Sequence, residues 1–320
     1  MVFWDLLGNN MDVPLANKIL SKYNLTPVQN IKKSEVGFSN NVYELDDKYI
    51  LKVCADDKGN EAQFRLEAQL YDYYRTTLPV PQLIAFDNTK TLMPHSFMLY
   101  HRIDGENLYN VWHTLSVEQR RNVVKQLCEM LRAINQTELT KLPSGTELEP
   151  VESWRRVIES RLDNYLQIAE QMQTLSPEVI TSTKQFIKQF ASSLDEQRLA
   201  LTYWDVHFDN ILVSEGKIAG LLDFERTEIT SIDFVLDTVK KMVDFPKKYM
   251  SEYAEQFAKD EDYEDLLNWY REFYPELFEF NNIERRLDLY SIAHDLQDLE
   301  GWPNVQSLKD NILKVISSKL

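Results

Sequence analysis

The chain has 320 residues, of which 43% are hydrophobic and 12% aromatic, and this composition is typical of an ordered globular protein with room for two lobes. A formal net charge of -16 argues against a nucleic-acid-binding face, which needs clustered lysine and arginine. No apolar run approaches the roughly 20 residues of a membrane span, and the N-terminus lacks a basic signal-peptide start. Cys54 and Cys128 match no zinc spacing. We therefore expect a cytoplasmic protein, a monomer or weak dimer, that binds neither membrane nor nucleic acid.

The acidic residues are concentrated in the C-terminal part of the chain. From Leu201 onward, about 25 aspartates and glutamates stand against about 13 lysines and arginines. One interpretation is a solvated acidic surface that keeps the protein soluble. The other is an acidic cleft that attracts a cationic substrate, and composition leaves both open.

The first hundred residues combine short strands with helices. Helical spacing of apolar residues predicts helices at Leu15–Tyr23 and Glu61–Tyr74. Alternating or wholly apolar runs predict three antiparallel strands within Val28–Val53 and two more at Leu83–Phe86 and Ser96–Ile103. A small antiparallel sheet accompanied by helices is expected here.

The rest of the chain is mainly helical. The Asp104-Gly105 pair breaks the strand pattern, so we place a boundary there between lobes of residues 1–103 and 104–320. Helical character extends from Val117 to Gln197 and is expected to resume after one short hairpin within Leu201–Glu225. This order of elements predicts an α+β fold.

The hairpin segment, LTYWDVHFDNILVSEGKIAGLLDFE, carries the most informative polar residues. Asp205 precedes Asn210 by five residues, and Asp223 follows a predicted strand–turn–strand that brings its two ends together. Carboxylate and amide oxygens are preferred Mg²⁺ ligands, and a separate carboxylate can accept a proton from a hydroxyl. Such residues also form surface turns, but acids embedded in apolar runs usually have a function. The pattern favours phosphoryl transfer from a nucleoside triphosphate.

The segments YWDVHFDNILV and GLLDFE resemble the catalytic and metal-binding signature of the aminoglycoside phosphotransferase and choline kinase family. The usual form of that signature is close to HGDLHxxN followed by IDFE or IDWE, so Tyr203 and Trp204 stand where the family commonly has His and Gly. The resemblance implies a bilobal protein-kinase-like fold, with a small antiparallel-sheet N-lobe and a larger helical C-lobe. It also implies that Asp205 is the catalytic base and that Asn210 and Asp223 are the metal ligands.

The first lobe carries further elements of the resemblance. Lys52 in a strand and Glu67 in a helix look like the pair that orients nucleotide phosphates, although an edge-strand lysine facing solvent is the alternative for Lys52. The segment GFSNNVYEL resembles the phosphate-covering loop, which implies nucleotide contacts from Gly37 and Ser39. An ordinary turn is the alternative for this segment.

A strand and hinge that hold the nucleotide base are implied by SFMLYHRIDGENL. Backbone groups near His101 and Ile103 would bond the edge of the base, and Tyr100 would stand at the back of its pocket. A large side chain there could favour guanine over adenine, whereas the alternative for Tyr100 is an ordinary core residue.

The resemblance implies a Mg²⁺-dependent kinase that transfers the γ-phosphoryl group of ATP or GTP to a hydroxyl of a small, cationic acceptor. An aminoglycoside is the leading choice, and antibiotic resistance would be its consequence. Choline and other amino alcohols, fructosamine-type sugars, macrolides and a nucleotide-binding pseudokinase are the alternatives. Candidate acceptor residues are His207, Glu225, Tyr290 and His294. For His207 the alternative is a residue that only packs against the site, and for Tyr290 and His294 it is an amphipathic helix face.

Overall fold

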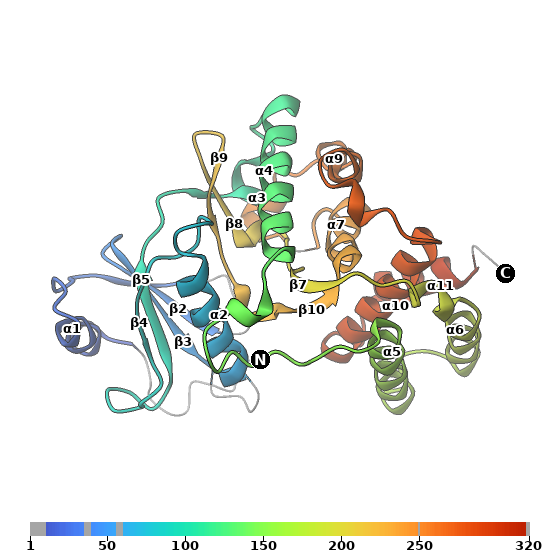
Figure 1. Cartoon of the computed structure of the whole chain (residues 1–320), viewed down its shortest axis with the longest axis horizontal. Coiled ribbons are helices and arrows are strands. Elements are labelled where there is room, and N and C mark those ends of the chain that lie inside the picture. The colour runs from blue at the N-terminus through green and yellow to red at the C-terminus, as the bar shows by residue number, and fades with distance from the viewer. Residues whose placement is uncertain (1–10, 35–39, 56–59, 249, 318–320) are drawn as a thin grey trace. The chain divides into compact units, whose positions relative to one another are not determined.

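The computed structural model describes residues 11–34, 40–55, 60–248 and 250–317 (Figure 1). The chain divides into two compact units, which are considered one at a time. The segments of unit 1 are Met1–Val111, Thr140–Glu147 and Phe208–Arg226, and those of unit 2 are Trp112–Leu139, Leu148–His207 and Thr227–Leu320. Among the described helices, none combines the length and apolar content needed to span a membrane.

Unit 1 is built on an antiparallel sheet, in which the described strands have the order β1-β2-β3-β5-β4. The strands are β1 (Ile31–Lys33), β2 (Asn40–Leu45), β3 (Tyr49–Cys54), β4 (Leu83–Asp87) and β5 (Phe97–His101). Every strand predicted for the first hundred residues is thus confirmed. The turn between β2 and β3 places Asp46 and Asp47 at φ 48° and 53°, a conformation that aspartate tolerates better than most residues. The order puts β3 in the middle of the sheet.

Two predicted helices accompany this sheet. In α1 (Val13–Lys22), Asp12 caps the N-terminus by accepting a hydrogen bond from the backbone nitrogen of Leu15 at 2.8 Å. The buried face of α1, with Ile19 and Leu20, joins the apolar side chains of the sheet in one core. The second helix, α2 (Asn60–Tyr74), carries Glu67 on its buried side.

The hairpin of β8 (Ile211–Ser214) and β9 (Lys217–Leu221) also belongs to unit 1, and it confirms the predicted strand–turn–strand. The strand β8 pairs with β6 (Glu106–Asn107). Leu221 of β9 donates its backbone N–H to the Pro79 carbonyl at 2.7 Å. Gly105 allows this approach, because a Cβ at that position would lie 3.2 Å from Leu212 Cβ. The hairpin comes after the predicted boundary near Asp104-Gly105 in the sequence, but its contacts place it in unit 1.

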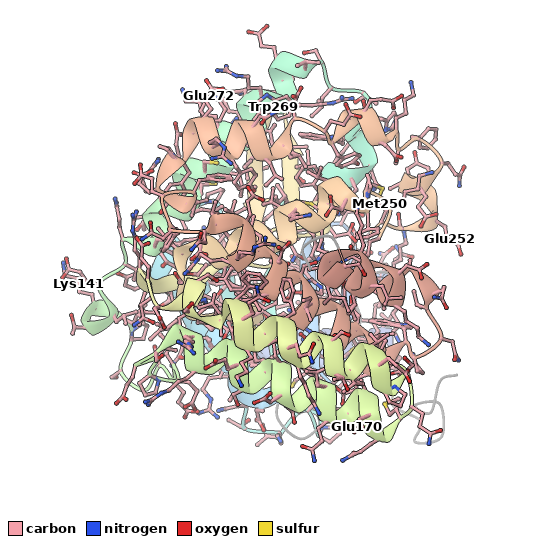
Figure 2. All side chains as sticks on the ribbon, turned by 90° about the vertical axis from the view of Figure 1, so that its right-hand side faces the viewer. Lys141, Glu170, Met250, Glu252, Trp269 and Glu272 are labelled. Atoms are coloured by element: carbon pink, nitrogen blue, oxygen red, sulfur yellow. The ribbon has the colours of Figure 1, made fainter. Side chains whose placement is uncertain are left out.

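Unit 2 is mainly helical, as expected. Its helices are α4 (Val117–Asn135), α5 (Trp154–Gln171), α6 (Pro177–Phe190), α7 (Val235–Asp244), α8 (Glu252–Glu255), α9 (Leu266–Phe273), α10 (Ile283–Gly301) and α11 (Gln306–Ser317), and α3 (Leu108–Trp112) lies where the chain enters this unit. On the surface, Glu272 of α9 pairs with Arg121 of α4 (Figure 2).

A second strand pair lies within unit 2. The strand β7 (Leu199–Tyr203) pairs antiparallel with β10 (Thr227–Ser231), so that Tyr203 lies opposite Thr227. The sequence predicted that helices would resume directly after the hairpin, and β10 corrects that prediction. Its five residues, TEITS, are too few to identify as a strand before their partner is known.

A fully buried arginine network holds the core of unit 2 together. The Arg286 guanidinium donates to Asp233 Oδ2 at 2.7 Å and to Asp233 Oδ1 at 2.8 Å. It also donates to the Ser193 and Glu196 carbonyls and to the hydroxyls of Ser231 and Tyr290. The Tyr290 hydroxyl donates to Asp233 Oδ2 at 2.9 Å and accepts from the Trp154 indole at 2.7 Å. The charge is buried but fully partnered, which is the condition under which it can stay ionised.

Removing the acidic partner of this arginine should destabilise the protein strongly. We expect Asp233→Ala to lower the free energy of unfolding by about 3–5 kcal/mol, because Arg286 would be left buried without its counter-charge. Urea denaturation measures the change. The exposed Asp163 of α5 provides the matched control, since Asp163→Ala should change stability by less than about 0.5 kcal/mol. Equal small effects in both variants would contradict this account of the core.

Candidate active site

Lys52 lies at the centre of the candidate site in unit 1. It is 6% exposed in the middle strand β3, so the alternative of a solvent-facing edge lysine does not hold. Its ammonium group donates to Glu67 Oε2 at 2.7 Å and to Asp223 Oδ1 at 2.8 Å. Glu225 Oε2 lies 3.7 Å away. The ion pair predicted between Lys52 of the strand and Glu67 of the helix is thus present.

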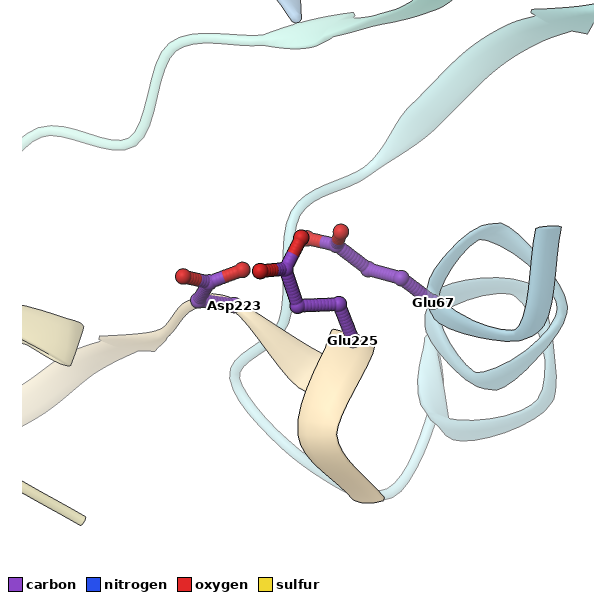
Figure 3. A group of neighbouring side chains, drawn as sticks. All are labelled: Glu67, Asp223 and Glu225. Atoms are coloured by element: carbon purple, nitrogen blue, oxygen red, sulfur yellow. The ribbon is translucent and has the colours of Figure 1, made fainter. Parts of the chain in front are cut away.

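The carboxylates around Lys52 come from separate elements of unit 1. Glu67 projects from α2, Asp223 follows β9, and Glu225 lies in the 3-10 helix η4 (Phe224–Arg226) (Figure 3). One oxygen from each of these three side chains lies within 4.8 Å of the others. A single ammonium group cannot neutralise three carboxylates, so the cluster has an excess of negative charge that a divalent cation with oxygen ligands would offset.

This charge imbalance shifts the protonation equilibria of the cluster. Burial by itself would lower the pKa of Lys52, but the attraction of Glu67, Asp223 and Glu225 raises it well above its ordinary value. Burial raises the pKa of Glu67 from 4.5 to about 7, against the opposing effect of Lys52, and the charges of Asp223 and Glu225 add to the rise. Lys52 therefore stays charged, and Glu67 titrates near neutral pH.

Two further side chains hold the carboxylates in place: Tyr71, which the sequence did not single out, and Asn40, from the segment that resembles the phosphate-covering loop. The Tyr71 hydroxyl donates to Glu67 Oε1 at 2.6 Å and accepts from the Asp223 backbone nitrogen at 2.9 Å. Asn40 Nδ2 donates to Glu225 Oε2 at 2.7 Å, and Asn40 Oδ1 accepts from the Ala55 backbone at 3.1 Å. Tyr71 follows Glu67 by one helical turn, and that spacing is the only sequence signal that would have found it.

Asp223 adopts an unusual backbone conformation. Its φ of 59° is in the left-handed region, which aspartate occupies more readily than most residues. The hydrogen bond from its backbone nitrogen to Tyr71 and the ion pair to Lys52 fix the residue in this conformation.

Asn210 lies beside Asp223 in the way the hairpin predicted. The register pairs Ile211 with Leu221, and the backbone nitrogen of Leu222 donates to the Asn210 carbonyl at 2.8 Å. Asn210 is 7% exposed at the end of the 3-10 helix η3 (Phe208–Asn210). The hairpin thus presents an amide and a carboxylate from adjacent strand ends.

Asp205 belongs to unit 2 and lies in the segment Trp204–His207, which has no regular secondary structure and follows β7. Its side chain is 18% exposed. His207 Nε2 lies 3.4 Å from Asp205 Oδ1, so one of the candidate acceptor residues is adjacent to the predicted base.

The residues predicted to bind the nucleotide base have well-defined places in β5 and just after it. Tyr100 is 8% exposed, its ring centre lies 6.2 Å from that of Tyr71, and burial raises its pKa. His101 is exposed and donates its backbone N–H to the Gln82 carbonyl at 3.2 Å. Ile103 is half-buried against the hairpin glycine Gly220. Gly37 and Ser39, predicted for the phosphate loop, lie outside the described residues.

The other acceptor candidates have different surroundings within their own units. Glu225 lies in the Lys52 cluster of unit 1, whereas Tyr290 is fully buried in the arginine network of unit 2. His294 is also in unit 2, where its Nδ1 lies 2.7 Å from Asp237 Oδ2 and its Nε2 lies 3.7 Å from Asp298 Oδ2. Of the late-helix candidates, only His294 keeps a partly exposed side chain, at 17%.

Comparison with known proteins identifies the family. Residues 30–273 match the sequence model of the phosphotransferase enzyme family, APH. The chain belongs to this family. It is therefore a phosphotransferase. No match is found among curated proteins.

Solved structures of aminoglycoside phosphotransferases share the fold of this phosphotransferase. ADP-bound APH(2'')-Ib matches with a TM-score of 0.66 and 15% identity, over 96% of this chain and 98% of that chain. The gentamicin complex of APH(2'')-IIa matches with a TM-score of 0.68 and 14% identity, over 97% of both chains. A thermostable APH(4)-Ia mutant in the apo form matches with a TM-score of 0.64 and 13% identity, over 94% of this chain and 98% of that chain. The predicted α+β, protein-kinase-like fold is confirmed.

The raised pKa of Glu67 should make stability depend on pH. Because the pKa of Glu67 rises from 4.5 to about 7 on folding, the folded state binds this proton more tightly than the unfolded chain does. The resulting stabilisation is complete below the ordinary pKa and is lost as the pH rises through about 7. Glutamine at position 67 cannot titrate, so we expect Glu67→Gln to abolish the part of the pH dependence that Glu67 contributes. The melting temperature of both proteins, measured between about pH 5 and pH 8 in the presence of a chelator, checks this. If the melting temperatures of the two proteins varied with pH in the same way, the raised pKa of Glu67 would be refuted.

Proposed function

We propose that this phosphotransferase is a Mg²⁺- and nucleoside-triphosphate-dependent kinase of a small, hydroxylated, cationic molecule, with an aminoglycoside as the favoured acceptor. The observation that carries the proposal is the Lys52 cluster. It unites a buried lysine, the helix glutamate Glu67 and the hairpin carboxylate Asp223 within hydrogen-bond distance. This is the equipment that kinases use to hold nucleotide phosphates and a metal ion.

The excess negative charge beside Lys52 supports a metal site in unit 1. We assign Asp223 and Asn210 as metal ligands and add Glu225, whose carboxylate lies within 4.8 Å of that of Asp223. The ion pair of Glu225 with Lys52 favours a position on the metal and phosphate side, in place of the acceptor role that the sequence predicts for it. When bound, Mg²⁺ would supply charge neutralisation at the phosphates. Lys52, oriented by Glu67, would bind phosphate oxygens.

On the acceptor side, Asp205 would accept the proton of the attacking hydroxyl. This role needs a carboxylate that an incoming molecule can reach, and the Asp205 side chain is 18% exposed. His207 is the acceptor candidate nearest to it. No covalent enzyme intermediate is needed, because transfer to the alcohol is direct.

The acidic C-terminal part of the chain supports a cationic acceptor. Structural neighbours have been solved with gentamicin and with kanamycin plus GDP, and gentamicin and kanamycin are both polycationic aminoglycosides. Choline, other amino alcohols, fructosamine-type sugars and macrolides are the alternative acceptors. The rival function of a pseudokinase is less well supported, since Lys52, Glu67 and Asp223 form the full ion-pair set.

A nucleoside-diphosphate release assay tests this function. We expect the wild-type protein with Mg²⁺ to turn over at least one aminoglycoside in a panel that also contains choline, ethanolamine, a macrolide and a ketoamine, with ATP and GTP tried separately. Asp205→Ala should lower turnover by about 100-fold or more while nucleotide affinity stays within about twofold, because general-base catalysis is lost and the phosphate site is intact.

Asp209→Ala is the matched control, since Asp209 is a nearby acid that is not assigned to the chemistry. Its turnover should remain close to that of the wild type. Nucleotide binding without transfer to any acceptor would support the pseudokinase instead. Near-normal turnover by Asp205→Ala would remove Asp205 from the mechanism.

A further inference from the structure

Trp204, the residue immediately before Asp205, is anchored in unit 2. Its indole Nε1 donates to Glu228 Oε1 at 2.8 Å, and its ring centre lies 5.2 Å from that of Phe234. Glu228 belongs to β10, where it pairs with Thr202 of β7. This pairing places Glu228 beside the end of the strand from which Trp204 emerges.

The other oxygen of Glu228 is also occupied. Arg161 of α5 donates to Glu228 Oε2 at 2.7 Å. The guanidinium carbon of Arg161 lies 5.6 Å from the ring centre of Phe234 and 5.7 Å from that of Trp154. Trp204, Glu228 and Arg161, which we call the Trp204 clamp, thus link α5, β10 and the segment after β7.

The clamp holds a segment that lies outside helices and strands. Residues Trp204–His207 form no helix or strand, and at Phe208 the chain leaves unit 2 for unit 1. A glycine, which the related signature commonly has in place of Trp204, would offer no side chain to anchor. Aromatic stacking and a charge-assisted hydrogen bond together provide such an anchor.

We propose that the Trp204 clamp is a positioning element that holds the catalytic segment, and with it Asp205, on unit 2. This inference rests on the proposed role of Asp205 as base. Successive Cα atoms are only about 3.8 Å apart, so a fixed Trp204 restricts the position of the next residue. Displacement of a catalytic group by about 1 Å can reduce a rate about 100-fold, so such a restraint matters for turnover.

Matched substitutions separate positioning from general stability. Trp204→Phe keeps the aromatic ring and removes the indole N–H, Glu228→Ala removes both hydrogen bonds, and Glu228→Gln keeps an oxygen that can accept from Trp204. We expect Trp204→Phe and Glu228→Ala each to lower kcat about 10-fold with nucleotide KM within about twofold. Glu228→Gln should recover only part of the loss, because its one amide oxygen can accept from Trp204 while its NH2 group faces the Arg161 donor. The double variant should be no worse than the poorer single variant, since both remove the same hydrogen bond.

Hydrogen exchange of the peptide that covers residues 204–207 gives a readout that does not depend on turnover. It should be faster in Trp204→Phe and Glu228→Ala than in the wild type, and intermediate in Glu228→Gln, which keeps one of the two acceptor oxygens. Unchanged exchange, additive losses, or faster exchange without any loss of kcat would overturn the proposal. If the wild-type protein transfers phosphate to no acceptor, the proposed function fails, and the exchange data alone then decide whether the clamp holds this segment.

Discussion

The ion pairs of Lys52 are the interaction on which the candidate site depends. A buried ammonium group is costly unless it is paired and hydrogen-bonded, so the position of Lys52 in the middle of a sheet requires anions around it. Glu67 and Asp223 meet this requirement from a helix and from the end of the hairpin. Both carboxylates contact Lys52 Nζ, and these contacts connect β3, α2 and the end of the hairpin within unit 1. The same arrangement leaves more negative charge than Lys52 can offset, and this surplus makes the cluster suited to a cation.

Much of this arrangement could be predicted from the sequence. A lysine inside an apolar strand implies an inward charge that needs a partner, and a hairpin with a two-residue turn brings Asn210 and Asp223 to adjacent strand ends. The position of Glu225 could not be predicted in this way. Asp223 has a positive φ and the chain then turns into a 3-10 helix, so simple alternation along a strand does not apply there. Asn40 meets Glu225 across 185 positions of sequence, and only the folded chain brings them together.

In unit 2 the limits of sequence reasoning have a different cause. Buried residues lie on several faces of α10, so hydrophobic periodicity does not tell which side chains line a site and which belong to the core. Tyr290 and His294, one turn apart, were equal candidates by spacing, yet Tyr290 is in the arginine network and His294 pairs with Asp237. For Trp204, by contrast, the sequence marks the residue as unusual and the structure supplies the reason. Its identity is unusual for the signature, and its hydrogen bond to Glu228 provides a physical reason for a large side chain there.

The Lys52 cluster carries surplus negative charge that a divalent cation would offset. Proton release in a pH-stat, measured as MgCl₂ is added to the unbuffered protein at about pH 7, tests this proposal most directly. A cation bound beside Asp223 and Glu225 should lower the raised pKa of Glu67, so the wild-type protein should release protons and Glu67→Gln should release markedly fewer. Absence of proton release from the wild-type protein, or equal release from both proteins, would contradict the claim.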